Sequence, residues 1–258
     1  MTSLITLPHA QATLDAQGAA CLTIVSHNHL NILSTPVIQD LTTALKELAL
    51  RDDIRVLTLR GQGDKAFVAG ADIKEMAKLE RISAEKFITG LHDLCEAVRR
   101  FPAPVIARIP GWCLGGGLEL AMACDIRLAA QGAQFGMPEV KVGIPSVIHA
   151  VLMPAMIGST QARWMLLSGE LVTSKQALDW GLITEEVPAD ELDQRLQAMV
   201  TLFCELAPQA VAQQKRLMRR WEQLPMTDAI QDTITEFGKA FDTGEPAQYM
   251  APWLKKDA

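Results

Sequence analysis

Three consecutive glycines followed by a carboxylate form the segment of this chain best suited to chemistry. Gly115, Gly116 and Gly117 run directly into an apolar, helix-forming stretch that carries Glu119. Glycine lets a backbone approach a ligand closely, and the first turn of a helix has amide N–H groups without intrahelical partners at the positive end of the helix dipole. Such amides can hold an oxygen on which negative charge develops. The segment therefore predicts an anion-stabilising site.

The position of Glu119 adds a proton-transfer group to that site. Glu119 follows Gly116 by three residues, so a helix that begins at the glycines places its carboxylate over the face where the oxygen would lie. The alternative, a solvent-facing helix residue, fits poorly because the neighbouring residues leave almost no polar face. These neighbours are Leu118, Leu120, Ala121, Met122 and Ala123.

A layered scaffold of strands and helices must position these residues. Apolar periodicity and turn residues predict a hairpin over 11–27, strands at 54–59, 104–109 and 126–130, and helices at 34–50, 73–79, 83–100 and after the glycines. This alternation continues to about residue 190 and predicts an α/β core. Beyond it, helices are expected at 190–206, 207–222, 227–241 and 245–256, and their apolar stripes must pack on the core or on another subunit.

Three motifs of the chain resemble those of the crotonase superfamily, the enoyl-CoA hydratase/isomerase family. They are LGGGLELAMACD at 114–125, AFVAGADIKEM at 66–76 and FGMPEV at 135–140. The resemblance spans nearly the whole chain, in the family's order and spacing. It implies a crotonase-like spiral of ββα repeats over 1–190 that carries a CoA-thioester site. It also implies a C-terminal helical region over 191–258 that forms homotrimers, which often pair into homohexamers.

The resemblance implies an activity, the addition of water across a 2-enoyl-CoA thioester. Negative charge then accumulates on the thioester oxygen, and the backbone amides of Ala71 and Gly116 would form the oxyanion hole. Glu119 would orient and deprotonate water, and Glu139 would deliver the α-proton. The substrate contacts implied by the resemblance are Asn28, Leu30, Ala69, Asp72, Ile73, Lys74, Leu114, Gly115 and Pro138. Coenzyme A would enter as part of the substrate, with no separate cofactor.

Other interpretations of these residues stay open at this point. Glu139 could be a surface glutamate after Pro138, and Asp72 could cap a helix over 73–79, which would also fix the nearby amides. An isomerase, or another lyase or hydrolase, could use the same oxyanion hole, although isomerisation can proceed with a single base. A non-catalytic or RNA-binding relative would be expected to lack a glutamate or to carry a strongly basic surface.

The chain also departs from the usual hydratase pattern near the site. Val147 and Ile148 stand where small residues are usual and are expected to reshape acyl preference, and Met137 stands where glutamine is frequent. Asn28 replaces a basic residue of many relatives. His149, at the start of an apolar helix, is expected to be structural.

The basic residues of the chain suggest no nucleic-acid surface. Lys74 matches a family position near the nucleotide phosphates, whereas Lys255 and Lys256 favour a solvated tail over a contact with CoA. A solvated helix face is likewise the favoured interpretation of Arg216, Arg219 and Arg220.

Composition limits the class of protein. Of 258 residues, 49% are hydrophobic and 21% are charged, which fits a globular chain, and a net charge of −6 argues against a broad nucleic-acid surface. No apolar run is long enough to predict a membrane span, and the sequence shows neither a metal-ligand cluster nor a targeting signal. Five scattered cysteines favour reduced thiols. A cytoplasmic protein without membrane or nucleic-acid partners is expected.

Overall fold

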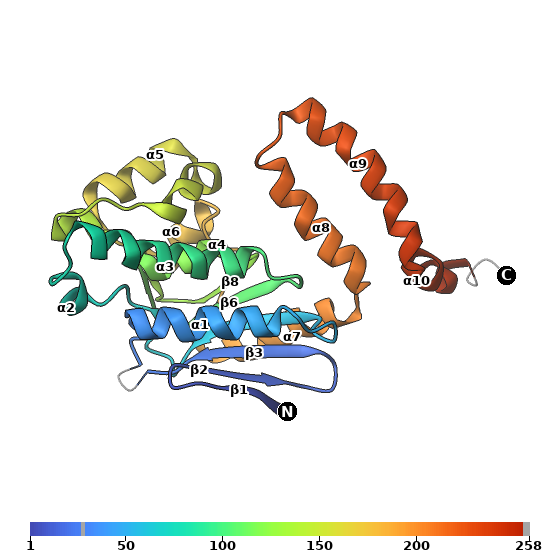
Figure 1. Cartoon of the computed structure of the whole chain (residues 1–258), viewed down its shortest axis with the longest axis horizontal. Coiled ribbons are helices and arrows are strands. Elements are labelled where there is room, and N and C mark those ends of the chain that lie inside the picture. The colour runs from blue at the N-terminus through green and yellow to red at the C-terminus, as the bar shows by residue number, and fades with distance from the viewer. Residues whose placement is uncertain (27–28, 255–258) are drawn as a thin grey trace.

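The computed structural model describes residues 1–26 and 29–254, which form two sheets surrounded by helices (Figure 1). The larger sheet has the strand order β1-β2-β3-β4-β6-β8-β11. Its strands are β1 (Thr2–Thr6), β2 (Ala10–Leu14), β3 (Ala19–Ile24), β4 (Val56–Gly61), β6 (Val105–Ile109), β8 (Ile126–Ala130) and β11 (Glu185–Val187). The first three strands are antiparallel, which confirms the expected hairpin, and the others pair in parallel.

The smaller sheet has the order β10-β9-β7-β5. Its strands are β5 (Ala66–Val68), β7 (Trp112–Leu114), β9 (Gln134–Gly136) and β10 (Val172–Thr173). Each of the strands β4, β6 and β8 is followed by a turn and then by one strand of the smaller sheet. These following strands, β5, β7 and β9, are parallel neighbours. The carboxyl ends of these three strands consequently lie at one edge, where ligands commonly bind in sheets of this kind.

The helices of the first part of the chain pack around the sheets. They are α1 (Thr35–Leu48), α2 (Ile73–Met76), α3 (Arg81–Arg99), α4 (Gly116–Ala123), α5 (Met153–Ser168) and α6 (Ser174–Asp179). Short 3-10 turns η1 (Pro138–Val142) and η2 (Ile148–Leu152) separate β9 from α5, and η3 (Ala189–Glu191) precedes α7. Helices α1, α3 and α4 bury apolar side chains in the main core; Leu41, Leu94 and Leu120 are fully buried there.

The C-terminal helices divide between two locations. They are α7 (Leu192–Glu205), α8 (Pro208–Trp221), α9 (Met226–Ala240) and α10 (Glu245–Leu254), with a 3-10 turn η4 (Phe241–Thr243) before α10. Leu192 and Met199 of α7 pack in a second apolar cluster with Val56, Ile106 and Leu128 of the larger sheet. Figure 1 shows α8 and α9 side by side, extending away from the sheets, with α10 at the end of α9 that lies beside the start of α8.

This architecture confirms the expected α/β fold with a C-terminal helical region, and most predicted elements differ from the observed ones by one to three residues at their ends. The division of the chain at residue 190 stays a prediction. Within the described ranges no helix is long and apolar enough to cross a membrane. The same residues contain no group of three or more metal-ligating side chains.

The basic face predicted on α8 is not simply solvated. Arg219 lies 3.3 Å from Glu96 of α3, and Arg220 pairs with Asp232 and Glu236 of α9, whereas Arg216 is exposed. The sequence could not reveal these pairs because the acidic partners belong to other helices. The acids offset most of the positive charge that the helix would otherwise present.

Lys215 attaches α8 to the body of the protein. Its ammonium donates to Asp125 Oδ2 at 2.6 Å, to the carbonyl of Ala103 at 3.1 Å and to that of Val98 at 3.4 Å. The side chain is almost completely buried, and burial is the main cause that lowers the pKa of its amine. Three oxygen acceptors compensate for the removal of this charge from water.

We expect Lys215→Met to lower the free energy of unfolding by about 3 kcal/mol, because Asp125 and two carbonyls lose their common donor. Chemical denaturation at fixed protomer concentration measures the change. The matched control is Lys175→Met, which removes an exposed pair with Asp179 and is expected to cost less than about 1 kcal/mol. Equal effects of the two substitutions would contradict the anchoring role of Lys215.

Candidate active site

Three loops meet where the parallel strands of the smaller sheet end. The loop after β5 contains Ala69, Gly70 and Ala71, the turn after β7 contains Gly115, and β9 leads into the 3-10 turn of Glu139. Val68 pairs with Cys113, and Leu114 pairs with Gly136, so strand pairing alone brings the three loops together. The sheet thus assembles all three sequence motifs at one edge.

The backbone N–H groups of Ala71 and Gly116 lie in the first two of these loops. Among the described residues, neither amide donates a hydrogen bond. Gly116 is the first residue of α4, where an amide has no intrahelical partner. Ala71 follows Gly70, whose φ of 116° is one that glycine adopts readily, and it forms a single parallel bridge with Leu33. Both amides are therefore available to an acceptor from outside the chain.

The neighbouring glycines allow two close contacts around Gly116. Gly115 has a φ of 53°, and a Cβ atom there would lie 2.6 Å from Oε1 of Glu139. A Cβ atom on Gly117 would lie 2.3 Å from the carbonyl oxygen of Val68, because the start of α4 packs directly on β5. Any side chain at these two positions would displace either the carboxylate or the strand.

Glu119 is buried on α4, as its apolar neighbours predicted, with only 3% of its surface exposed. Its Oε1 accepts the N–H of Ala150 at 3.0 Å, and the N–H of His149 also bonds to the carboxylate. The pKa of Glu119 is raised to about 8, mainly by burial and to a smaller extent by the charge of Glu139, while the two amides act in the opposite direction. The two carboxyl groups are therefore electrostatically coupled.

Glu139 lies on η1, directly after Pro138, and is partly buried rather than a surface residue. Its Oε2 accepts a hydrogen bond from Ser146 Oγ at 2.8 Å. Burial raises the pKa of this carboxyl too, and the Ser146 bond partly offsets the effect. A second carboxyl with a raised pKa thus stands beside the first, an arrangement suited to proton transfer near neutral pH.

The other predicted substrate residues occupy several settings around the strand ends. Asp72 caps α2 by accepting the N–H of Lys74 at 2.8 Å and that of Glu75 at 3.2 Å, so the capping interpretation is correct. Ala69 donates to the carbonyl of Leu30 at 2.9 Å.

Several of these residues are accessible to a ligand. Ile73 is 60% exposed and Lys74 is exposed, whereas Leu114 and Pro138 are partly buried. Asn28, Lys255 and Lys256 lie outside the described residues.

The unusual loop after Glu139 supplies contacts that the sequence did not reveal. Ser146 holds one carboxylate, and the amides of His149 and Ala150 hold the other. The position of Ser146, seven residues after Glu139, could have indicated its bond to that carboxylate. The amide contacts of Glu119 could be found only from the tertiary structure. Val147 is 41% exposed, whereas Ile148 packs against the main core; their effect on acyl preference stays a prediction.

Comparisons with known proteins agree on one family. Residues 15–254 match the family model described as enoyl-CoA hydratase/isomerase. The chain is 30% identical over 245 residues to a short-chain-enoyl-CoA hydratase of Clostridium acetobutylicum, covering 94% of each protein. It is 31% identical over 230 residues to a crotonyl-CoA hydratase of Syntrophomonas wolfei, covering 88% of each. A crystal structure of an enoyl-CoA hydratase from Mycobacterium smegmatis superposes with a TM-score of 0.93 at 30% identity, covering 97% of each chain.

The fold is that of crotonase-type enzymes. The chain belongs to the enoyl-CoA hydratase/isomerase family of the crotonase superfamily, which confirms the resemblance noted in its three motifs.

Proposed function

We propose that this enzyme adds water across the double bond of a 2-enoyl-CoA thioester. The observation that carries the proposal is that two amides with no acceptor among the described residues lie at the ends of neighbouring strands together with two coupled carboxyl groups. Hydration requires both features, because charge develops on the thioester oxygen while two protons move. Coenzyme A enters with the substrate, and no separate cofactor is needed for these steps.

In the proposed reaction, the carboxylate of Glu119 takes a proton from water as the water oxygen attacks the β-carbon. The electron pair of the double bond moves toward the thioester, and the amides of Ala71 and Gly116 donate to the oxygen that becomes negative. The carboxylic acid of Glu139 then gives its proton to the α-carbon. A proton exchange with solvent restores both glutamates.

A panel of 2-enoyl-CoA thioesters tests this function through the loss of conjugated absorbance. The alternative, double-bond isomerisation, requires only one base, and a 3-enoyl-CoA substrate would then gain conjugated absorbance. Glu139 argues for hydration because a second partly buried carboxyl is not required for isomerisation. Activity on the 3-enoyl ester alone would overturn the hydratase proposal.

The pH dependence tests whether the reaction needs one ionised and one protonated glutamate. The Glu119 base must be ionised while Glu139 keeps its proton, and a pKa of about 8 means that this coupled pair loses its last proton around this pH. We expect kcat/KM to fall about tenfold between roughly pH 7 and roughly pH 9, because the fully ionised pair has no acid to protonate the α-carbon. Enzyme-free blanks correct for thioester hydrolysis at alkaline pH. An increase of kcat/KM through about pH 8 would show that no protonated carboxyl is needed and would contradict the role of Glu139 as the acid.

We further propose that the enzyme is a homotrimer or homohexamer assembled through its C-terminal helices. Supporting this, α9 and the following turn expose several large apolar side chains, which are Ile230, Ile234, Phe237 and Phe241. Exposed apolar patches of this kind commonly mark protein interfaces. The five free thiols suit a reducing compartment, and we propose a cytoplasmic location.

A further inference from the structure

The two amides that bind Glu119 come from a strained turn. His149 and Ala150 belong to η2, which begins at Ile148 with a φ of 37°. A β-branched residue rarely adopts a positive φ, and such backbone strain persists only where surrounding contacts hold it. Something must therefore keep this turn in place against Glu119.

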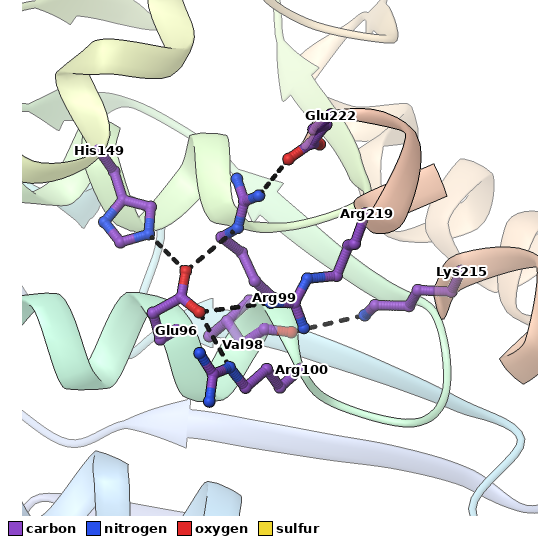
Figure 2. A network of polar contacts seen from close by, with 8 residues as sticks. All are labelled: Glu96, Val98, Arg99, Arg100, His149, Lys215, Arg219 and Glu222. Atoms are coloured by element: carbon purple, nitrogen blue, oxygen red, sulfur yellow. Dashed lines mark hydrogen bonds and ion pairs between the residues drawn. The ribbon is translucent and has the colours of Figure 1, made fainter. Parts of the chain in front are cut away.

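The side chain of His149 provides one such contact. It is 5% exposed, and its Nε2 lies 3.3 Å from Oε1 of Glu96 on α3 (Figure 2). Burial lowers the pKa of the imidazole, so the neutral ring donates its Nε2–H to the carboxylate near neutral pH. The ring also lies against His92, with the ring centroids 5.5 Å apart.

Glu96 is itself held from several directions. Figure 2 shows Arg99, Arg100 and Arg219 around its carboxylate, at 3.3, 2.9 and 3.3 Å. Arg219 belongs to α8, and Arg99 also pairs with Glu222 just after that helix. The same carboxylate thus contacts the turn beneath Glu119 and the first of the projecting helices.

We propose that His149 and Glu96 are positioning residues, which hold the strained turn so that its two amides stay bonded to the Glu119 carboxylate. Arg219 extends this support to the C-terminal helices. The inference rests on the proposed function for its relevance to catalysis, because it assumes that Glu119 reacts. A merely structural histidine would affect folding without changing the ionisation of Glu119.

Loss of the His149 contact has a predictable electrostatic sign. The amides stabilise the charged form of Glu119, so their withdrawal raises its pKa above about 8. The other ionisable groups near this carboxyl are Glu139 on η1 and Cys95 on α3. Those facing the imidazole are Glu96, Arg99 and His92 on α3. None of these groups is altered by a substitution of His149.

The test is an infrared titration of the Glu119 carboxyl, with Glu119→Gln as the spectral blank. His149→Ala is expected to raise this pKa by about one unit and to lower kcat about tenfold, with little change in KM. His149→Gln keeps a donor near the position of Nε2 and is expected to restore both values. His92→Ala, which removes only the ring contact, is the matched control.

Glu96→Ala removes the same bond from the other side and leaves the turn's own sequence intact, so the test survives if His149→Ala fails to fold. It must raise the pKa of Glu119 in the same direction. A folded variant of either kind with an unchanged Glu119 pKa overturns the inference. Because the titration needs no turnover, a wild-type protein without hydratase activity would defeat only the proposed function.

Discussion

Glu119→Gln is expected to lower kcat for hydration by about 10² or more, and Glu139→Gln by a similar factor. Glutamine preserves the size of each side chain but can neither take the proton of water nor give one to carbon. Binding of a saturated acyl-CoA should be nearly retained, because neither carboxyl is needed to hold the thioester. Steady-state kinetics and calorimetric titration of each purified variant measure the two quantities.

A matched substitution controls for the loss of a carboxylate elsewhere. Glu85→Gln changes an exposed glutamate of α3 and is expected to leave kcat unchanged. Near-normal turnover of either active-site variant would contradict the two-carboxylate mechanism. If only Glu139→Gln left kcat unchanged, a single base would suffice, and the isomerase alternative would gain support.

Gly116→Pro is expected to lower kcat by about 10² to 10³, because proline removes the amide of α4 that we propose as a donor to the thioester oxygen. Proline is tolerated at the first position of a helix, which is where Gly116 lies, so the helix is expected to form. Hydration kinetics, with circular dichroism as the test of folding, measure the effect.

Gly116→Ala separates the lost donor from steric disturbance. Its Cβ atom meets the same neighbour as that of proline, a terminal methyl of Leu91 at 2.8 Å, which a flexible side chain can relieve. The alanine variant keeps its N–H and is expected to retain most of the activity. Equal losses in the proline and alanine variants would show that the amide does not serve the reaction.

The sequence predicted those features that depend on neighbouring residues. The apolar stretch around Glu119 predicted a buried carboxylate, and the glycines predicted a helix start with available amides. Asp72 predicted a helix cap that the structure confirms. Each of these follows from local backbone geometry or from the periodicity of a single helix.

Features that depend on distant residues escaped prediction. The bond between Ala150 and Glu119 joins positions 31 residues apart, and that between His149 and Glu96 joins positions 53 apart. The positive φ of Ile148 could not be expected either, since its residue type disfavours it. The roles of Ala71, Gly116 and Glu139 came from resemblance to a family rather than from any local rule, and they stay predictions.

At the edge formed by the paired strands β5 and β7, the candidate anion-binding groups belong to the backbone, whereas the candidate proton-transfer groups are side chains. The two candidate anion-binding amides follow from strand pairing and from the start of α4, and neither depends on which side chain stands at position 119 or 139. Replacing these two carboxylates would therefore be expected to change the reaction while leaving the proposed thioester-binding backbone in place. For an enzyme engineer, this edge of the sheet is therefore a proposed thioester-binding backbone at which positions 119 and 139 could be exchanged to change the chemistry.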